Sequence, residues 1–482
     1  MALLPMVTVL SPDEIKAIDK STRELLQSVG IKFSNAEALD IFEQGGAKVD
    51  RASNLVFIPD KLFDETVEKC TPSVKFYARG GHPTSNLEGD NVFYGTGGFS
   101  TQCLDGATMK YRPTLTSDLE RFARLYETLE RPHFGITQIT PTDVPPEVSD
   151  LVEFKVMSTN TKKHLIIEAK HGKHLDLIMD MAALVSGISR EEYREKPWFS
   201  IMICITSPLF QRTDLSDLII SAARFGVPMV AEAGPMAGAT SPATMGHTLV
   251  QTNAENFAAI SLAKLVNPDV PIVYASWSRI FDMKWAMVCQ GGPEFGMQRI
   301  ATTQMAKYYN MPSGGGGCLT ESKFLDAQYG FEKMITTLLP AMAGCNIILG
   351  MGLTADQDAH SAEAMVIDEE ITGYIERVRQ GFRINDDTTN LDVIRAVGPE
   401  GAFIEEMHTL QNFRQEMYIP QVCNRQPATH GVDLSKRTII EATQARIEKL
   451  LASWSGPKVP EGAVEKMDEI IARRAKELGV LF

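Results

Sequence analysis

Aromatic residues lie at or just past the ends of several short apolar runs in this 482-residue sequence. They are Tyr94, Phe99, Trp277, Phe281 and Trp285. Aromatic faces attract quaternary ammonium ions, which carry a positive charge but have no N–H group to donate. The competing interpretation is that each ring only packs the end of the fold. As a group, the rings predict a pocket for a methylated cation.

Ionisable and amide side chains follow the same runs. We expect Glu232 to act as the catalytic residue by supplying negative charge to the cation. The side chains expected to contact the substrate are Tyr94, Phe99, Gln138, Trp277, Arg279, Phe281 and His360. If the substrate carries a carboxylate, the candidate donors are Arg279, Lys284, His360 and backbone amides of the glycine-rich turns. His360 is favoured because an imidazole donates in both its neutral and its charged form.

Glycine also recurs where the runs end. The positions that we expect to face a large partner are Gly97, Gly98, Gly315, Gly316, Gly317 and Gly352. A residue without Cβ lets a bulky group, such as a planar macrocycle, approach the backbone closely. The alternative is that these glycines only make tight turns.

Several common catalytic patterns are missing from the sequence, among them the P-loop, HExxH and a serine elbow motif. The seven cysteines are scattered singly, which is typical of reduced cytoplasmic thiols rather than of a metal knuckle. His164, His171 and His174 are close in sequence, but the first begins an apolar run and the others follow its far end. We therefore expect no metal site.

A repeated strand–helix pattern must position these residues. Apolar or β-branched runs occupy residues 92–95, 134–139, 164–168, 200–205, 228–232, 271–275, 311–315 and 346–350. Helical patterns follow at 116–129, 148–158, 173–187, 213–225, 243–266, 296–309, 321–342 and 362–379. Continuous apolar runs are typical of parallel strands covered on both faces. Eight such units, with no GxGxxG motif for an open sheet, predict an α/β fold of the (β/α)8 barrel type.

In such a barrel the active site lies at the carboxyl ends of the strands, where the candidate residues fall. The seventh run has little β-propensity, because four successive glycines occupy residues 314–317. We predict an N-terminal cap over residues 1–88, the barrel over 89–380, and a mostly helical extension over 381–482. Two charged helices in the extension, 437–453 and 464–478, are expected to be solvated or to face an interface, and we expect a homo-oligomer.

The composition indicates which classes of molecule this protein can bind. The net charge is −14, from 61 acidic and 47 basic residues, which opposes binding to nucleic acid and weakly favours a cationic substrate. The N-terminus lacks the basic region of a signal peptide and is interrupted by Pro5, so we expect no signal peptide. No apolar run approaches the roughly 20 residues of a membrane span. We expect a cytoplasmic protein that does not enter membranes.

Longer stretches resemble a known family. They are GGGGCLTESKFLDAQ (residues 314–328), LLPAMAGCN (338–346), VIDEEI (366–371), YGTGG (94–98) and AEAGPMAGAT (231–240). These resemble the trimethylamine methyltransferase family, and the similarity extends over most of the chain. The resemblance implies a (β/α)8 barrel that passes a methyl group from a methylamine to the cobalt of a separate corrinoid protein. It implies no tightly bound cofactor in this chain.

The resemblance also bears on the substrate. Archaeal trimethylamine enzymes of the family carry pyrrolysine near the seventh strand, whereas residues 313–320 here are all standard. The sequence is therefore similar to the non-pyrrolysine branch, which demethylates quaternary amines such as glycine betaine, proline betaine and carnitine. A quaternary nitrogen leaves as a neutral amine, so the lack of an acid–base pair fits this chemistry.

Two other classes of function remain open from the sequence. One is a barrel enzyme that uses acid–base chemistry, with Glu232 or Glu168 as the base and Lys170 beside an oxyanion. The other is a non-catalytic protein that binds betaines.

Overall fold

The computed structural model describes residues 7–106, 108–427 and 438–481. Eight parallel strands form a closed barrel in chain order, and the last strand pairs with the first. They are β6 (Phe93–Thr96), β9 (Pro132–Ile136), β10 (His164–Ile167), β11 (Phe199–Ile205), β13 (Met229–Ala233), β15 (Ile272–Ser276), β18 (Ser313–Gly316) and β19 (Ile347–Met351). This confirms the predicted (β/α)8 barrel.

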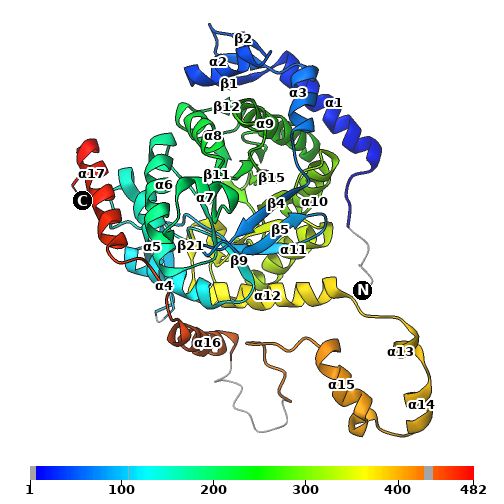
Figure 1. Ribbon diagram of the computed structural model, residues 1–482. Coiled ribbons are helices and arrows are strands. Elements are labelled where there is room, and N and C mark those ends of the chain that lie inside the picture. Colours follow the sequence, from blue (N-terminus) through cyan, green and yellow to red (C-terminus); the bar gives the residue numbers. More distant parts are fainter. Residues whose placement is uncertain (1–6, 107, 428–437, 482) are drawn as a thin grey trace.

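Eight helices surround the barrel (Figure 1). They are α4 (Thr116–Thr128), α5 (Ser149–Asn160), α6 (Gly172–Ser186), α8 (Thr213–Phe225), α9 (Met245–Val266), α10 (Pro293–Tyr308), α11 (Ala327–Ala343) and α12 (Ala362–Gln380). All eight confirm predicted helices. The seventh starts six residues later than expected, because Asp326 caps it by accepting a hydrogen bond from Tyr329 N at 3.1 Å.

The glycine-rich seventh strand lies where its neighbours leave no space for side chains. A Cβ atom on Gly314 or Gly316 would lie within 3.0 Å of a neighbouring side chain. Gly315 has a φ of 153°, a conformation that other residues rarely adopt. Pairing with β15 and β19 then holds this segment in the barrel despite its low β-propensity.

A hairpin closes the N-terminal end of the barrel. Its strands are β4 (Ser73–Tyr77) and β5 (Pro83–Glu88), and Figure 1 shows them across the barrel opening. Their side chains Val74, Phe76 and Leu87 join the apolar residues inside the barrel. A single apolar core therefore continues from the hairpin into the barrel.

The rest of the N-terminal cap contains α1 (Pro12–Ser28), β1 (Ile31–Phe33), α2 (Ala36–Gln44), β2 (Lys48–Asp50), β3 (Leu55–Phe57) and α3 (Asp60–Glu68). The opening helix starts with a capping box between Ser11 and Glu14. Strands β1 to β3 extend β12 (Phe210–Gln211), which follows β11 in the chain. This small sheet therefore lies beside the carboxyl end of the fourth barrel strand.

Short strands build walls around the carboxyl ends of the barrel strands. One sheet contains β7 (Gln102–Asp105), β8 (Lys110–Pro113), β20 (Leu353–Thr354) and β21 (Ala359–His360). The other contains β14 (Met236–Ala237), β16 (Arg279–Asp282) and β17 (Met287–Cys289). The remaining short helices are η1 (Pro146–Val148), α7 (Arg190–Glu195) and η2 (Ala355–Gln357). Most of these elements are too short for a periodic pattern to predict them.

The C-terminal extension has two parts. Helices α16 (Ile439–Ser453) and α17 (Ala463–Leu478) lie against the barrel helices, as α16 contacts α12 and α4, and α17 contacts α5 and α6. Before them come α13 (Asp386–Thr389), α14 (Asp392–Val397), η3 (Phe403–Glu405) and α15 (Met407–Glu416), which stand clear of the barrel in Figure 1. Among the described residues, no helix is long and apolar enough to cross a membrane.

Candidate active site

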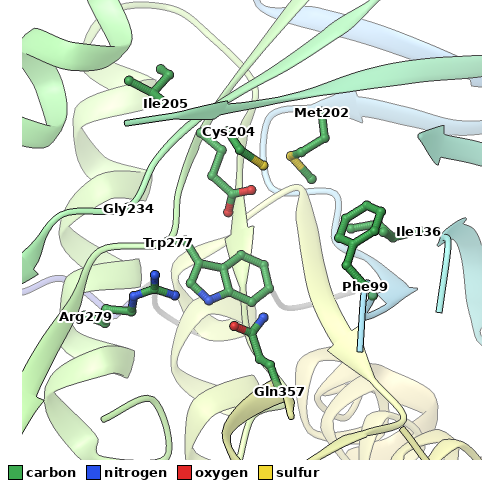
Figure 2. Close-up of a pocket in the computed structure, with 11 residues that line it drawn as sticks. Phe99, Ile136, Met202, Cys204, Ile205, Gly234, Trp277, Arg279 and Gln357 are labelled. Atoms are coloured by element: carbon green, nitrogen blue, oxygen red, sulfur yellow. The ribbon is translucent and has the colours of Figure 1, made fainter. Parts of the chain in front are cut away.

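A cavity of about 210 Å³ opens at the carboxyl ends of the barrel strands (Figure 2). Its walls come from loops and strand ends far apart in the sequence. The lining residues are Gly98, Phe99, Ile136, Met202, Cys204, Ile205, Glu232, Gly234, Trp277, Arg279 and Gln357. Phe99, Glu232, Trp277 and Arg279, which the sequence predicts as catalytic or substrate-binding residues, are therefore brought together, and Gly98 lies with them.

Two opposite charges with free hydrogen-bonding groups face this cavity. Glu232 is 6% exposed, and its Oε1 has no hydrogen-bond partner within the described chain. Burial raises the pKa of Glu232 to about 7, although Arg299 and Arg279 oppose that shift. The Nε of Arg279 is likewise unpaired among the described residues, and burial lowers the pKa of its guanidinium. Buried groups of this kind are costly unless a ligand satisfies them.

The indole of Trp277 is held in one orientation. Its Nε1 donates a hydrogen bond to Gln290 Oε1. The amide of Gln290 then donates to Asp356 Oδ1 at 2.8 Å and to Gln357 Oε1 at 3.1 Å. Figure 2 shows the indole and the ring of Phe99 pointing into the cavity. The cavity therefore has two aromatic walls, one of them fixed by a hydrogen-bonded chain.

The loop after the eighth strand holds an unusual backbone. Ala355, Asp356 and Gln357 have φ values of 49°, 59° and 72°, in the left-handed region that residues other than glycine rarely adopt. Hydrogen bonds from Asp356 N to Thr320 O, at 2.9 Å, and from Ser100 Oγ to Gln357 O, at 2.8 Å, stabilise this segment. It brings Gln357 to the cavity, a role that no sequence pattern indicates.

A buried arginine lies beneath the site. Arg299, on α10, donates from Nη2 to Ser276 Oγ at 3.1 Å and to Ser278 Oγ at 2.7 Å. These two serines flank Trp277, so the guanidinium fixes the backbone that carries the indole. Its charge also helps to lower the pKa of Glu232 against the effect of burial. The sequence offered no signal for this residue, because it lies in the middle of a helix.

A second cavity, of about 430 Å³, shares Phe99, Met202 and Cys204 with the first. It is rich in charged side chains, which are Asp150, Glu153, Glu168, Lys170, Arg212 and Asp214. Burial and the nearby Asp150 raise the pKa of Glu153 to about 8. Glu168 accepts a hydrogen bond from Cys204 Sγ at 3.0 Å. Glu168 and Lys170, the candidates for acid–base chemistry, therefore lie beside the first cavity rather than in its lining.

Tyr94 does not line the cavity, which corrects the expectation that it contacts the substrate. It is buried in an apolar cluster with Cys318, Ile348 and Ile367, between the barrel and the helices around it. Side chains alternate along a strand between the interior and the exterior of a barrel. In β6 the interior positions fall to Phe93 and Gly95, so Tyr94 points outward.

Three other predicted contacts also lie outside both cavities, judged from the residues that the structure describes. Gln138 is buried and donates to Thr96 Oγ1 at 3.5 Å. Phe281 lies on β16 opposite Val288. His360 is buried with its ring against Phe122, and burial lowers its pKa to about 3, so it is neutral. Its strand pairs with β7, which turns the ring toward α4 instead of the cavity.

The glycines expected to face a macrocycle are packed against protein. A Cβ atom on any of them would lie within 3.0 Å of a neighbouring atom of this chain. The positions are Gly97, Gly98, Gly315, Gly316, Gly317 and Gly352. Gly98 alone among them lines the cavity described above, within the described chain. These glycines therefore allow close packing of strands and loops, and the approach of a large ligand to them stays a prediction.

The histidines that are close in sequence have other partners. His174 Nδ1 lies 2.9 Å from Asp150 Oδ2, and its Nε2 accepts a hydrogen bond from Arg474 Nε at 3.0 Å. His164 lies at the opposite end of its strand, stacked on Phe76. The contact between Arg474 and His174 connects the C-terminal helix α17 to the barrel.

Comparisons with known proteins agree on one family. A family model described as trimethylamine methyltransferase (MTTB) matches residues 2–479. Trimethylamine methyltransferase MttB of Desulfitobacterium hafniense is 31% identical over 470 residues, which cover 98% of this chain and 94% of the relative. Glycine betaine methyltransferase of another strain of that species is 30% identical over 484 residues, 99% of each chain.

A solved structure supports the fold. The crystal structure of the Methanosarcina barkeri monomethylamine methyltransferase matches with a TM-score of 0.52. The match covers 100% of this chain and 91% of that one, at 11% sequence identity. At this identity the likeness bears on the barrel fold alone.

Proposed function

The chain belongs to the trimethylamine methyltransferase family and is a methyltransferase, and from this premise we propose that its methyl donor is a quaternary amine of the betaine type. We propose that the methyl acceptor is a separate corrinoid protein of the cytoplasm. One observation carries the substrate class. The cavity combines aromatic walls with an unpaired carboxylate oxygen and an unpaired guanidinium N–H, which together complement a small zwitterion.

The ammonium group binds between Trp277 and Phe99, beside Glu232. Aromatic faces are worth about 0.5–2 kcal/mol each to a desolvated cation. The Glu232 carboxylate adds charge, and its unpaired Oε1 faces the same cavity. A bound cation also favours the ionised form of a carboxyl group whose pKa burial has raised.

The carboxylate end binds Arg279. Of the side-chain donors predicted from the sequence only Arg279 remains, because His360 is neutral and neither His360 nor Lys284 lines the two described cavities. A guanidinium N–H donates a strong charge-assisted hydrogen bond to a carboxylate. Glu232 on the barrel strand β13 and Arg279 at the start of β16 then orient the zwitterion in one direction.

The chemistry demands little proton transfer from the protein. When the bond from a methyl carbon to a quaternary nitrogen breaks, its electron pair stays on nitrogen and a neutral amine leaves. The corrinoid supplies the cobalt nucleophile that takes the methyl group. The residues of this chain hold the substrate, exclude water and fix the direction of the methyl group, which is where a positioning enzyme gains its rate.

The rim of the barrel end fits a protein-sized partner. Apolar side chains there are 52–71% exposed, and they are Met283, Trp285, Met287 and Phe324. The first three lie on the β16–β17 hairpin. This hairpin begins at Arg279, which lines the cavity. Exposed apolar patches of this kind mark docking surfaces. We assign this rim, rather than the packed glycines, to the corrinoid protein.

The region around the seventh strand supports a quaternary over a tertiary amine. Within the described chain, no residue from 313–320 lines the cavity, and all eight of these residues are buried. The chain therefore places no electrophile there to capture the lone pair of a free amine. A quaternary amine has no such lone pair and needs none.

A methyl-transfer assay tests this proposal. Purified protein is mixed with a reduced corrinoid protein and with glycine betaine, proline betaine, carnitine, choline or trimethylamine, and loss of Co(I) absorbance is followed. We expect turnover of at least one betaine and much slower turnover of trimethylamine. Equal rates for trimethylamine and the best betaine would contradict the substrate class.

Other outcomes would favour the alternatives. Tight betaine binding without any methylation of cobalt would indicate a binding protein. Proton abstraction from a substrate without a corrinoid partner would indicate acid–base chemistry at Glu232 or Glu168. Stoichiometric corrinoid in the purified chain would contradict a separate carrier protein.

A further inference from the structure

The second cavity holds charged groups that the proposed function leaves unused. It adjoins the first cavity at Phe99, Met202 and Cys204, which line both. Figure 2 shows Phe99 and Met202 on the side of the first cavity away from Arg279. Because the proposed function places the substrate carboxylate at Arg279, the nitrogen end of the substrate points toward the second cavity.

Two of the four acidic side chains in the second cavity already have partners within the chain. Asp150 accepts a hydrogen bond from Lys170 N at 2.9 Å and lies 2.9 Å from His174 Nδ1. Both carboxylate oxygens of Asp214 accept hydrogen bonds from Arg212, at 3.1 and 2.9 Å. These two acids therefore offer little to a ligand.

The other two acidic side chains, Glu153 and Glu168, keep the capacity to accept hydrogen bonds. Glu153 is 5% exposed, and Thr140 is the hydrogen-bond donor that the described chain offers to its carboxyl group. Glu168 accepts a hydrogen bond from Cys204 Sγ at 3.0 Å. An ionised carboxyl group has about four acceptor positions, so both residues retain lone pairs in the cavity that they line.

The two cavities differ in the kind of ammonium ion that they satisfy. The first has two aromatic walls, Trp277 and Phe99, which suit a quaternary ion without an N–H group. Of the described residues that line the second, Phe99 alone is aromatic, and the carboxyl groups of Glu153 and Glu168 are the acceptors in need of a donor. A buried acceptor without a donor is costly, and only an ammonium ion with an N–H group can donate to it. The second cavity therefore suits a protonated tertiary amine.

We propose that the second cavity binds the protonated tertiary amine that forms when the quaternary substrate loses its methyl group, and that Glu153 and Glu168 accept its N–H group. The assignment of this amine as the product rests on the proposed function. The binding of an ammonium ion with an N–H group does not, because it depends only on the two carboxyl groups and the cavity around them.

Glu153 also supplies the proton. Methyl transfer leaves the electron pair on nitrogen, so the amine is neutral when it leaves the first cavity. Burial, together with the charges of Asp150 and Glu168, raises the pKa of Glu153 to about 8 against the opposing effects of Lys170 and Thr140, so this carboxyl group is mostly protonated at pH 7. Its O–H bond breaks as the N–H bond of the ammonium ion forms. The carboxylate that remains then pairs with the new cation.

Titration with a matched pair of ions tests the inference without any corrinoid protein. Trimethylammonium and tetramethylammonium differ by one methyl group, and only trimethylammonium has an N–H group. In isothermal titration of the full-length protein at pH 7, trimethylammonium should bind with unchanged affinity when tetramethylammonium saturates the first cavity. Competition between the two ions, or no binding of trimethylammonium, would overturn the inference.

One variant of each cavity separates the two sites. Glu153→Gln should weaken binding of trimethylammonium by about ten- to a hundredfold, which corresponds to the loss of a hydrogen bond to a charged group. It should leave the affinity for tetramethylammonium unchanged. Trp277→Ala should have the reverse pattern, because the indole lines the first cavity only. Loss of both ions in either variant would contradict separate sites.

A matched control tests whether net charge alone explains the loss. Glu147→Gln makes the same substitution at an exposed residue that does not line the second cavity. It should bind trimethylammonium as the wild type does, and an equal loss in Glu147→Gln and Glu153→Gln would overturn the inference. Circular dichroism and thermal melting check that all three variants fold. Glutamine resembles the neutral carboxyl group of Glu153, so we expect that variant to fold.

Proton release gives a second measurement. A bound cation favours the ionised form of a nearby carboxyl group, so trimethylammonium should release about one proton from Glu153 at pH 7. Titration in buffers with different enthalpies of ionisation measures this release, which Glu153→Gln should abolish. Release at the wild-type level in that variant would overturn the assignment of Glu153. Failure of tetramethylammonium to bind, with trimethylammonium behaving as expected, would instead support this inference and contradict the proposed function.

Discussion

The two ends of the barrel interior differ in how their polar groups are satisfied. At the N-terminal end, His164 stacks on Phe76 with ring centroids 3.8 Å apart. Its two ring nitrogens lie 3.2 Å from Tyr77 O and 3.1 Å from Ser200 Oγ. Burial lowers the pKa of His164 to about 3, so the ring is neutral and fully paired.

At the carboxyl end of the barrel, by contrast, some buried polar atoms have no hydrogen-bond partner in the described chain. Glu232 and Arg279 are held in a cavity, and each keeps an atom without a hydrogen-bond partner in the described chain. The chain also holds Asp356 there, in a left-handed conformation, and burial raises its pKa to about 7. One end is therefore arranged for stability, whereas the other keeps costly groups that a ligand can satisfy.

The largest effect is expected from the hairpin that closes the N-terminal end. Replacing Phe76 with alanine should lower the free energy of unfolding by about 3–5 kcal/mol, because it leaves a cavity in a dry core. Phe99→Ala, at the other end, should cost less, since Phe99 is only partly buried. Urea unfolding of both variants measures the difference. Equal losses would remove the contrast between the two ends.

Glu232→Gln should stabilise the protein at pH 8, by up to about 3 kcal/mol. Folding raises the pKa of this carboxyl group from 4.5 to about 7, and each unit corresponds to about 1.4 kcal/mol. Between these values the folded state binds more protons than the unfolded state, so stability falls as pH rises, and the full cost is present above pH 7. Substitution with glutamine removes that cost.

Thermal melting at several pH values checks this result. Near pH 4 the Glu232→Gln variant and the wild type should melt at similar temperatures, and they should diverge as the pH approaches 8. Glu332 is a control, because it accepts hydrogen bonds from Thr320 Oγ1 and Glu321 N. Glu332→Gln should therefore destabilise the protein, and stabilisation by both substitutions would contradict the explanation.

Arg279→Gln should weaken binding of glycine betaine by about 1.5–3 kcal/mol, which is the range for a hydrogen bond to a charged group. Choline lacks the carboxylate and should bind the variant and the wild type similarly. His360→Ala serves as the comparison, because its ring lies against Phe122 outside the cavity. Isothermal titration with both ligands measures these affinities. If His360→Ala weakens binding of betaine and Arg279→Gln does not, His360 would be the carboxylate donor, as the sequence predicts.

Removal of one aromatic wall of the cavity should have the smallest of these effects. Trp277→Ala should weaken binding of a quaternary ammonium ion by about 0.5–2 kcal/mol, or roughly tenfold. Phe281→Ala and Tyr94→Phe should leave the affinity nearly unchanged, because neither side chain lines the described cavities. Titration with choline tests all three. An unchanged affinity in Trp277→Ala would place the cation elsewhere.

Some of these features are already determined by the sequence. Apolar runs and helical periodicity predict all eight strands and helices of the barrel, because burial on both faces demands that pattern. Since active sites of barrels lie at strand ends, the same pattern places Phe99, Glu232, Trp277 and Arg279 near one another. The charges and aromatic rings of these four residues then indicate a cationic ligand.

Only the tertiary structure decided which side chains of a strand face the cavity. Tyr94 and Phe99 are both aromatic residues near the end of β6, yet one points outward and the other lines the cavity. The direction depends on where the strand begins its alternation, which pairing with its neighbours sets. Propensity and composition carry no information about that register.

The loop contacts were also decided by the tertiary structure. Gln357 reaches the cavity through three left-handed residues that hydrogen bonds from other loops stabilise. Arg299 reaches Ser276 and Ser278 from the middle of a helix. The glycines near the strand ends pack against neighbouring elements. Each of these roles depends on atoms distant in the sequence, and local residue types therefore could not predict it.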